Sequence, residues 1–211
     1  MSKEGLILVV SGFSGVGKGT VVKRLLEKYD NYALSVSATT RAPREGETNG
    51  KEYFFVSEEE FSAMAESGQL IEYAGYVGHH YGTPREYVQN RLEAGVDIIL
   101  EIEIQGALNV KRQYPDAVLV FVIPPDAATL KRRLVGRGTE TLPVIEERLK
   151  RAVEESEGME RYDYLLVNDD LETCVEELHQ IMICEHRKAG LNQELIDCIR
   201  DDLKRFVKGE R

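Results

Sequence analysis

The sequence lacks the features that mark secreted, membrane or disulfide-stabilised proteins. It has only three cysteines in 211 residues and no CxxC pair, so neither a disulfide framework nor a cysteine metal site is expected. No apolar run approaches the roughly 20 residues that a membrane-spanning helix needs. The apolar stretch LILVV near the start is too short for the core of a signal peptide. These absences predict a cytoplasmic protein.

Basic charge is also scarce. Lysine and arginine total 27 against 37 aspartate and glutamate residues, which gives a formal net charge of −10. Binding to nucleic acid or to an acidic membrane needs a basic face, so neither partner is expected. A small anionic substrate is compatible with this charge if the basic side chains gather locally. The length suits one compact domain with a sizeable core.

Continuous apolar runs alternate with amphipathic helical patterns along the chain. Such runs are typical of strands buried on both faces of a parallel sheet. They lie at residues 6–10, 33–37, 97–104, 117–123 and 164–167. Capping signals predict helices that begin after Ser57, Thr83 and Asp126, with a proline at the first helical position after Thr83. The order predicts an α/β fold built on a doubly wound, mainly parallel five-stranded sheet.

Two segments interrupt this alternation. Residues of about 37–82 contain short, polar and aromatic strands, which predict a small antiparallel insertion carried by the core. The glycine-bearing segment 136–143 lies between two helical patterns and is expected to be exposed. The C-terminal residues predict one more amphipathic helix, and the sequence leaves open whether that helix covers the core or forms a dimer contact.

The segment GFSGVGK at residues 12–18 has the spacing G-x-x-x-x-G-K, between a strand pattern and a helical pattern. Glycines let successive backbone N–H groups point at phosphate oxygens, and a helix N-terminus favours anions. Lys18 can contact the two outer phosphates of a nucleotide as a point charge. This context predicts a nucleotide-phosphate site rather than a structural turn. The residues expected to bind ATP here are Ser14, Gly15, Val16, Gly17, Lys18, Gly19 and Thr20.

Gly19 stands where many phosphate-loop proteins have the serine or threonine that binds Mg²⁺. No direct protein ligand to a metal is therefore expected, and the ATP phosphates and water would hold Mg²⁺. Glu101 lies in a predicted strand, near its carboxyl end, where a carboxylate can orient those waters. Thr20 is expected to contact an inner phosphate.

A second anion-binding segment is predicted near residue 40. Arg41 and Arg44 are three residues apart with a proline between them. This spacing is a poor core pattern, and it suits a clamp for oxyanions. A solvated basic loop is the alternative interpretation of this stretch alone.

Seven motifs taken together resemble the guanylate kinase family. They are GxSGVGKGT, SxTTRxPRxGExxGxxYxF, GxLxEYA, YGTP, EIxxQGA, RGTET and VNDD, in the family's order from about residue 5 to 187. The resemblance implies a core of residues 1–36, 83–135 and 150–211, a GMP-binding insertion at 37–82 and a mobile lid at 136–149. It implies ATP-dependent phosphorylation of GMP, with dGMP as a secondary substrate and Mg²⁺ as the cofactor. ATP and GMP would be the partners of a monomer or homodimer.

The resemblance also implies which residues hold GMP. Those that would take its phosphate are Arg41, Arg44, Tyr53 and Tyr81. Those that would surround its base are Ser37, Glu72, Thr83 and Glu103. The Watson–Crick edge of guanine presents two adjacent donors, and one carboxylate can accept both. Adenine has no such donor at N1 and would leave a buried Glu72 unpaired.

The resemblance further implies that lid arginines neutralise the charge on the moving phosphoryl group while the closed lid excludes water. The residues expected to take part in catalysis are Lys18, Arg41, Arg133, Arg137 and Arg148. Those that complete the ATP site are Arg133, Arg137 and Asn168. Arg132 and Arg151 are expected to be helix-surface charges that nearby glutamates balance. No general base is needed, because the attacking phosphate of GMP is already anionic near neutral pH.

Two other function classes compete with this interpretation. One is a catalytically silent module that binds proteins, but such modules lose the phosphate-loop lysine and the arginines that this chain retains. The other is a kinase for a different monophosphate or a phosphorylated sugar. Glu72 together with Ser37 favours guanine over these substrates.

Overall fold

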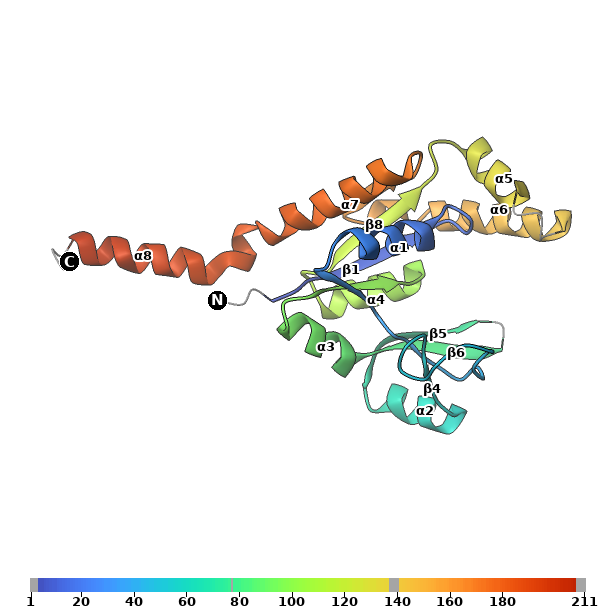
Figure 1. The fold of residues 1–211 in the computed structure, drawn as a ribbon, viewed down its shortest axis with the longest axis horizontal. Coiled ribbons are helices and arrows are strands. Elements are labelled where there is room, and N and C mark those ends of the chain that lie inside the picture. The colour runs from blue at the N-terminus through green and yellow to red at the C-terminus, as the bar shows by residue number, and fades with distance from the viewer. Residues whose placement is uncertain (1–3, 77, 137–140, 208–211) are drawn as a thin grey trace.

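The computed structural model of the chain describes residues 4–76, 78–136 and 141–207. Its main body is built on a five-stranded sheet in the order β2-β7-β1-β8-β9, and every neighbouring pair in this sheet is parallel (Figure 1). The strands are β1 (Ile7–Gly12), β2 (Tyr32–Leu34), β7 (Asp97–Glu101), β8 (Val118–Ile123) and β9 (Tyr164–Val167). This sheet confirms the predicted doubly wound α/β fold.

The centre of the sheet is apolar on both faces. Leu8, Val9 and Phe121 have no exposed surface, and Leu8 of β1 pairs with Val118 of β8. Each such side chain stabilises the fold by about 1.5–3 kcal/mol when it leaves water. The two central strands therefore form a rigid platform for the loops that follow their carboxyl ends.

Helices cover both faces of the sheet (Figure 1). On one face α1 (Lys18–Lys28) and α7 (Leu171–His186) pack side by side, and α4 (Ile104–Gln113) lies on the other. The remaining α-helices beside the sheet are α3 (Arg85–Glu93), α5 (Ala127–Gly136) and α6 (Leu142–Ser156). Short 3₁₀ turns lie at Met159–Arg161 and Ala189–Asn192, and the helix α8 (Gln193–Val207) ends the described chain. Within the described ranges, no helix has both the length and the apolar character that crossing a membrane requires.

A second sheet, in the order β4-β3-β6-β5, is separate from the first. It consists of β3 (Ala38–Thr39), β4 (Phe54–Phe55), β5 (Leu70–Tyr76) and β6 (His79–Pro84), and α2 (Glu58–Glu66) packs on it. Ser57 and Glu60 form the capping box predicted at the start of α2. The antiparallel prediction is correct for β3–β6 and β5–β6, but β3 and β4 run parallel.

The predicted helix start at Thr83 is wrong in its capping. Pro84, not Thr83, is the N-cap residue of α3, and no side chain caps this helix. The Thr83 hydroxyl instead donates to Oε1 of the buried Glu72, at 2.6 Å. A buried carboxylate needs a donor more than an exposed helix end does, because water cannot reach it.

Asp97 joins three elements at the amino end of the sheet. Its side chain is 1% exposed, and its Oδ1 accepts from the backbone N–H of Leu6 at 2.8 Å. His186, at the end of α7, donates from Nε2 to the same carboxylate at 2.8 Å. The first residue of β7 therefore fixes the entry to β1 and the last turn of α7.

We predict that Asp97→Ala lowers the free energy of unfolding by about 2–4 kcal/mol, because it leaves a buried N–H and a histidine without their acceptor. Chemical denaturation of the purified protein measures this change. Asp116→Ala, at an exposed position, is the control and should change stability by about 0.5 kcal/mol or less. Equal stability of the two variants would contradict the structural role of Asp97.

Candidate active site

The loop between β1 and α1 surrounds an open cavity of about 630 Å³. Gly15 and Gly17 have φ angles of 84° and 100°, in the left-handed region that favours glycine. A Cβ at Gly17 would lie 2.6 Å from Nδ2 of Asn168, so the site tolerates no side chain there. The residues that line the cavity are Phe13, Ser14, Gly15, Gly17, Lys18, Gly19, Thr20, Lys23 and Glu101.

Three residues from distant segments hold this loop. The carbonyl oxygen of Val16 accepts from Nδ2 of Asn168 at 2.8 Å and from Nη1 of Arg133 at 3.2 Å. Nη1 of Arg148 donates to Oγ of Ser14 at 2.5 Å. The structure thus brings the predicted ATP residues Arg133 and Asn168, and the predicted catalytic residue Arg148, to the loop. Arg137 lies outside the described residues.

Lys18 begins α1 and turns its ammonium group back over the loop. Its Nζ donates to the carbonyl oxygens of Gly12 at 2.6 Å and Phe13 at 3.3 Å. Burial lowers the pKa of Lys18, and the negative charges of Glu103 and Glu101 oppose that shift. An anion bound in the loop would also favour the charged ammonium form. Glu101 faces the start of α1, since a Cβ at Gly19 would lie 3.8 Å from both of its carboxylate oxygens.

A second cluster of predicted site residues lies in the smaller sheet and its loops. The guanidinium carbon of Arg41 lies 5.3 Å from the ring centroid of Tyr53, and the rings of Tyr53 and Tyr81 meet edge to face at 5.9 Å. One arginine and two phenol groups therefore converge, as expected for a phosphate clamp. Arg44 lies nearby in the same loop and is exposed.

Glu47 positions this cluster, although it is not among the site residues predicted from the sequence. Its carboxylate accepts from Arg41 in bidentate fashion, with Nη1–Oε2 at 3.0 Å and Nη2–Oε1 at 2.9 Å. It also accepts from the backbone N–H of Arg44 at 2.7 Å. These donors, Arg41 first, lower the pKa of the Glu47 carboxyl. The available signal was an acidic residue close to two arginines inside the same motif.

Glu72 lies on β5 and is only 7% exposed. Burial raises the pKa of its carboxyl, and the hydrogen bond from Thr83 opposes that shift. Its second oxygen lies against the start of α4, where a Cβ at Gly106 would come within 2.8 Å of Oε2. Gly106 therefore leaves room for the carboxylate. A buried carboxylate of this kind is suited to accept hydrogen bonds from a ligand.

The two remaining residues of the predicted base site occupy different surroundings. Ser37 is half-buried beside β3. Glu103 is the N-cap residue of α4, and its Oε2 pairs with Nη2 of Arg151 at 3.2 Å. Arg151 also pairs with Glu155 of its own helix at 3.0 Å, so it is the surface charge balanced by glutamates that was predicted, and its pair with Glu103 also joins α6 to α4. Arg132 donates to Thr129 of its own helix.

Comparison with known proteins agrees with this arrangement, since the family model described as guanylate kinase matches residues 4–185. The chain belongs to the guanylate kinase family. It is 52% identical over 189 residues to the guanylate kinase of Halalkalibacterium halodurans, a match that covers 89% of this chain and 93% of that protein. The guanylate kinase of Lactococcus lactis is 48% identical, with coverage of 97% and 100%.

A solved structure gives the same result. The crystal structure of guanylate kinase from Anaplasma phagocytophilum resembles this chain with a TM-score of 0.69 and 36% identity, over 89% of each chain. Family membership confirms the activity predicted from the sequence, which is ATP-dependent phosphorylation of GMP. The roles of the residues described above are therefore considered for this reaction.

The first prediction from this geometry concerns Glu47. We expect Glu47→Gln to raise KM for GMP about tenfold, because Arg41 loses the charged partner that fixes its direction. KM for ATP should stay unchanged in steady-state kinetics. Glu45→Gln, at an exposed neighbouring position, is the control. A lower KM for GMP would show instead that Glu47 competes with the phosphate for Arg41.

Proposed function

We propose that the two residue clusters form one two-nucleotide site, in which ATP donates and GMP accepts the phosphoryl group. Both clusters adjoin the carboxyl end of β7. Glu101, the last residue of that strand, lines the cavity of the phosphate loop. Gly106, five residues later, lies against the carboxylate of Glu72. This adjacency of a phosphate cavity and a buried carboxylate is the observation that carries the proposal.

In the acceptor half, Glu72 accepts from N1–H and N2–H₂ of guanine, while Thr83 fixes the carboxylate. Ser37 and Glu103 complete the surroundings of the base. Arg41 and Arg44 hold the phosphate of GMP. The hydroxyl groups of Tyr53 and Tyr81, the two tyrosines beside Arg41, contact the same phosphate. None of these base and phosphate contacts needs the ribose 2′-hydroxyl, so dGMP is a second substrate.

In the donor half, the backbone N–H groups of residues 14–20 and the ammonium of Lys18 hold the phosphates of ATP. An oxygen of the GMP phosphate forms a bond to the γ-phosphorus of ATP. The bond from that phosphorus to the β–γ bridging oxygen breaks, and ADP leaves with the electron pair. Arg133, Arg137 and Arg148 neutralise charge on the transferred group, so positioning and electrostatics carry the catalysis. Asn168 supports the loop by donating to the carbonyl oxygen of Val16, and it lies near the adenine of ATP.

The side chains around the loop fit Mg²⁺, which takes oxygen ligands and keeps several waters. Glu101 lines the loop cavity and would orient those waters, and Thr20 lines the same cavity and would contact an inner phosphate. The ATP phosphates and water would hold the ion. Bound there, Mg²⁺ neutralises phosphate charge.

Domain movement completes the proposed cycle. The lid, residues 136–149, and the GMP-binding insertion, residues 37–82, close over the core when both nucleotides are bound. The bridge from Arg151 on α6 to Glu103 on α4 supports this, because α6 begins inside the lid segment and the bridge links this helix to the acceptor half. We place the enzyme in the cytoplasm, with no nucleic-acid or membrane partner, in keeping with its net charge of −10.

A coupled ADP-release assay with GMP, dGMP, AMP, UMP, CMP and dTMP tests the proposed substrate site. GMP should give the highest kcat/KM, with dGMP next. AMP should be lower by about 10⁴-fold, because it leaves the buried carboxylate unpaired. Comparable kcat/KM values for GMP and AMP would refute the guanine site.

A second prediction concerns the base contact itself. Glu72→Gln should lower kcat/KM for GMP by about 10³-fold, because the amide turns a donor toward a donor of guanine. KM for ATP should not change. Glu59→Gln, at an exposed position of α2, is the matched control. An equal loss of catalytic efficiency with respect to GMP and ATP would show that Glu72 does not contact the guanine base.

A third prediction concerns the phosphate loop. Lys18→Ala should lower kcat by about 10³-fold or more, because the outer phosphates lose their point charge in a partly desolvated site. Circular dichroism should show an unchanged fold. Lys131→Ala, on the exposed side of α5, should retain full activity. Unchanged turnover in the Lys18 variant would contradict the phosphate-binding role of the loop.

A further inference from the structure

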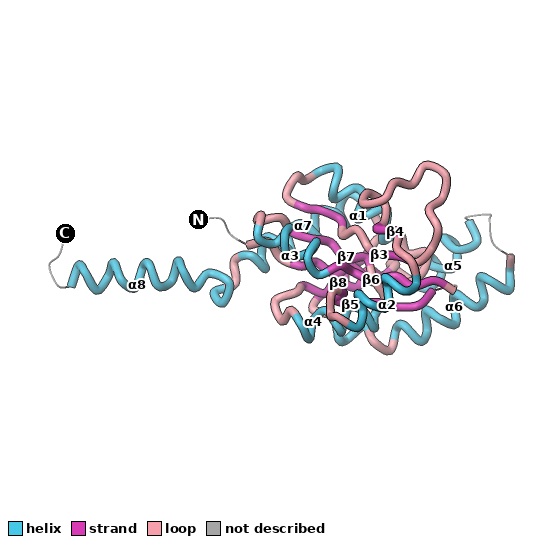
Figure 2. Tube along the Cα trace, turned by 90° about the horizontal axis from the view of Figure 1, so that it is seen from below, coloured by secondary structure: helices cyan, strands magenta, loops and turns pink. Residues whose placement is uncertain are grey.

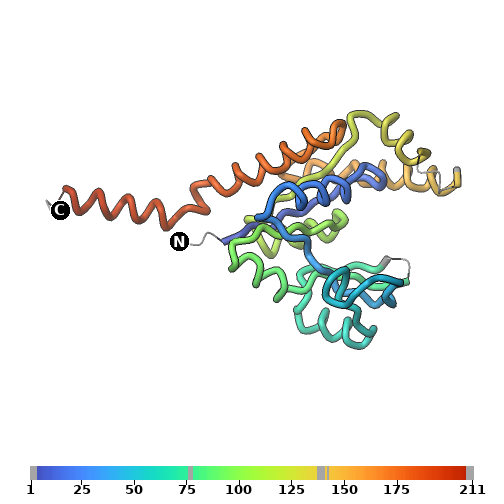
Figure 3. Tube along the Cα trace, in the orientation of Figure 1, coloured from blue at the N-terminus to red at the C-terminus, as the bar shows by residue number. Residues whose placement is uncertain are grey.

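The helix α8 takes no part in the site described above. Figures 1 and 2 show it projecting from the main body, and Figure 3 shows that it is the last described segment of the chain. Its large apolar side chains are exposed: Leu195 by 60%, Ile199 by 53%, Leu203 by 60% and Phe206 by 73%. A contiguous apolar surface of this kind marks an interaction site, because monomeric proteins rarely expose one.

The apolar residues of α8 follow the spacing of a helix-pairing seam. Ile196, Ile199, Leu203 and Phe206 are separated by three, four and three residues, as in a coiled-coil heptad. Most of the other residues of the helix are charged. Ion pairs within the helix join Asp197 to Arg200 at 2.6 Å, Asp201 to Lys204 at 2.8 Å and Asp202 to Arg205 at 3.5 Å. The seam is therefore suited to another amphipathic helix.

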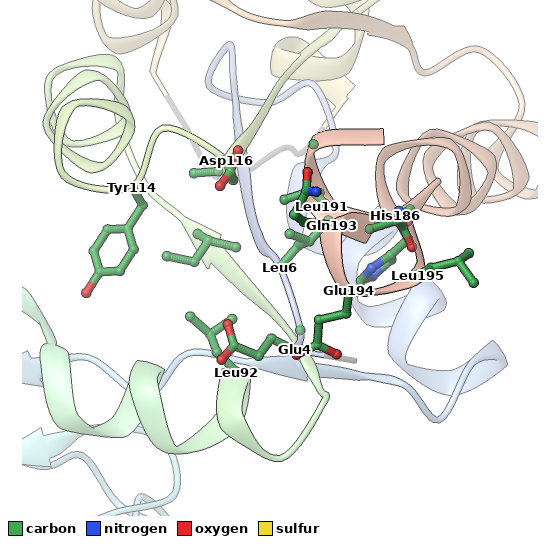
Figure 4. Close-up of a pocket in the computed structure, with 15 residues that line it drawn as sticks. Glu4, Leu6, Leu92, Tyr114, Asp116, His186, Leu191, Gln193, Glu194 and Leu195 are labelled. Atoms are coloured by element: carbon green, nitrogen blue, oxygen red, sulfur yellow. Dashed lines mark hydrogen bonds between the residues drawn. The ribbon is translucent and has the colours of Figure 1, made fainter. Parts of the chain in front are cut away.

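A cavity of about 650 Å³ lies at the base of α8 (Figure 4). It sits at the amino ends of β1 and β8, away from the phosphate loop at the carboxyl end of β1. Leucines and carboxylates share its lining, namely Leu6, Leu92, Leu191, Leu195, Glu4, Asp116 and Glu194. Leu195 lines the cavity and directly precedes Ile196, the first residue of the seam, so the leucines of the cavity continue the apolar seam.

The distribution of charge along α8 favours one direction in which a second copy of the helix would pair with it. The first turns carry Glu194 and Asp197, next to the acidic cavity. The last turns carry three basic residues, Arg200, Lys204 and Arg205, against two acidic ones, Asp201 and Asp202, so that end of the helix is basic on balance. A parallel pair of these helices would place like charges together. An antiparallel pair places the basic end of each helix at the acidic cavity of the other. A second copy of the chain therefore satisfies both the apolar and the charge pattern.

We propose that α8 pairs antiparallel with α8 of a second copy and seats Phe206 of each chain at the cavity of the other. If Ile199 faces Leu203 of the second copy, Phe206 of that copy faces Ile196, next to Leu195. The helix has 15 residues and is about 22 Å long at 1.5 Å per residue. The two active sites remain open at the opposite ends of the strands.

Sedimentation equilibrium of the full chain tests this proposal. The expected mass is twice the 23.9 kDa of one chain. Ile199→Gln with Leu203→Gln should give monomers with unchanged kinase activity. Arg200→Gln with Asp201→Gln removes one charge of each sign from the polar face at constant net charge and leaves Lys204 and Arg205 in place, so this matched control should remain dimeric. A wild-type monomer at 0.1 mM protein, a concentration on the order of common assays, would overturn the proposal.

Charge reversal tests the antiparallel direction. Lys204→Glu with Arg205→Glu should raise the dissociation constant of the dimer at least about tenfold, because acidic groups then meet the acidic cavity. An unchanged constant would overturn the antiparallel arrangement. Hydrogen exchange of α8 covers the remaining case: strong protection in a monomeric wild type would show the helix folded onto its own cavity and refute self-association.

Discussion

The parallel pairing of β1 with β7 is the constraint on which the active site depends. Val10 of β1 lies beside Glu101 of β7, so the segments that follow these two strands emerge together at one edge of the sheet. One segment becomes the phosphate loop, and the other leads through Glu103 to the start of α4. Donor and acceptor residues that are far apart in the sequence thereby become neighbours, without either segment crossing the core. Burial of both strands keeps this edge rigid.

Hydrogen bonds from distant residues then fix what the sheet brings together. Val16 shows this in the loop, where its carbonyl accepts from Asn168 and Arg133. Glu72 shows it in the acceptor half, where the carboxylate accepts from Thr83 and rests against Gly106. Both groups are held by partners from other elements, so the geometry that the proposed phosphoryl transfer needs is largely present before substrates bind.

The sequence predicted the parts of this arrangement that depend on local pattern. Continuous apolar runs located the buried strands, and the glycine spacing located the phosphate loop. The sequence did not predict Glu47 holding Arg41 or Arg151 joining α6 to α4, because these pairs depend on the path of a loop and on the packing of two helices. The capping role expected of Thr83 failed for a physical reason: its hydroxyl serves the buried Glu72, and no local pattern reveals that contact. The exposed seam of α8 was visible as amphipathicity, but its position beside an acidic cavity required the fold.

In the proposed site the Glu72 carboxylate binds guanine, and the phosphate loop holds ATP at the same edge of the sheet. A crystal structure with GMP and a non-hydrolysable ATP analogue tests it most directly. The account predicts N1 and N2 of guanine within about 3 Å of the Glu72 carboxylate oxygens, and the γ-phosphate over Lys18, facing the GMP phosphate. A guanine ring bound away from Glu72, or phosphates bound outside the loop, would contradict the account.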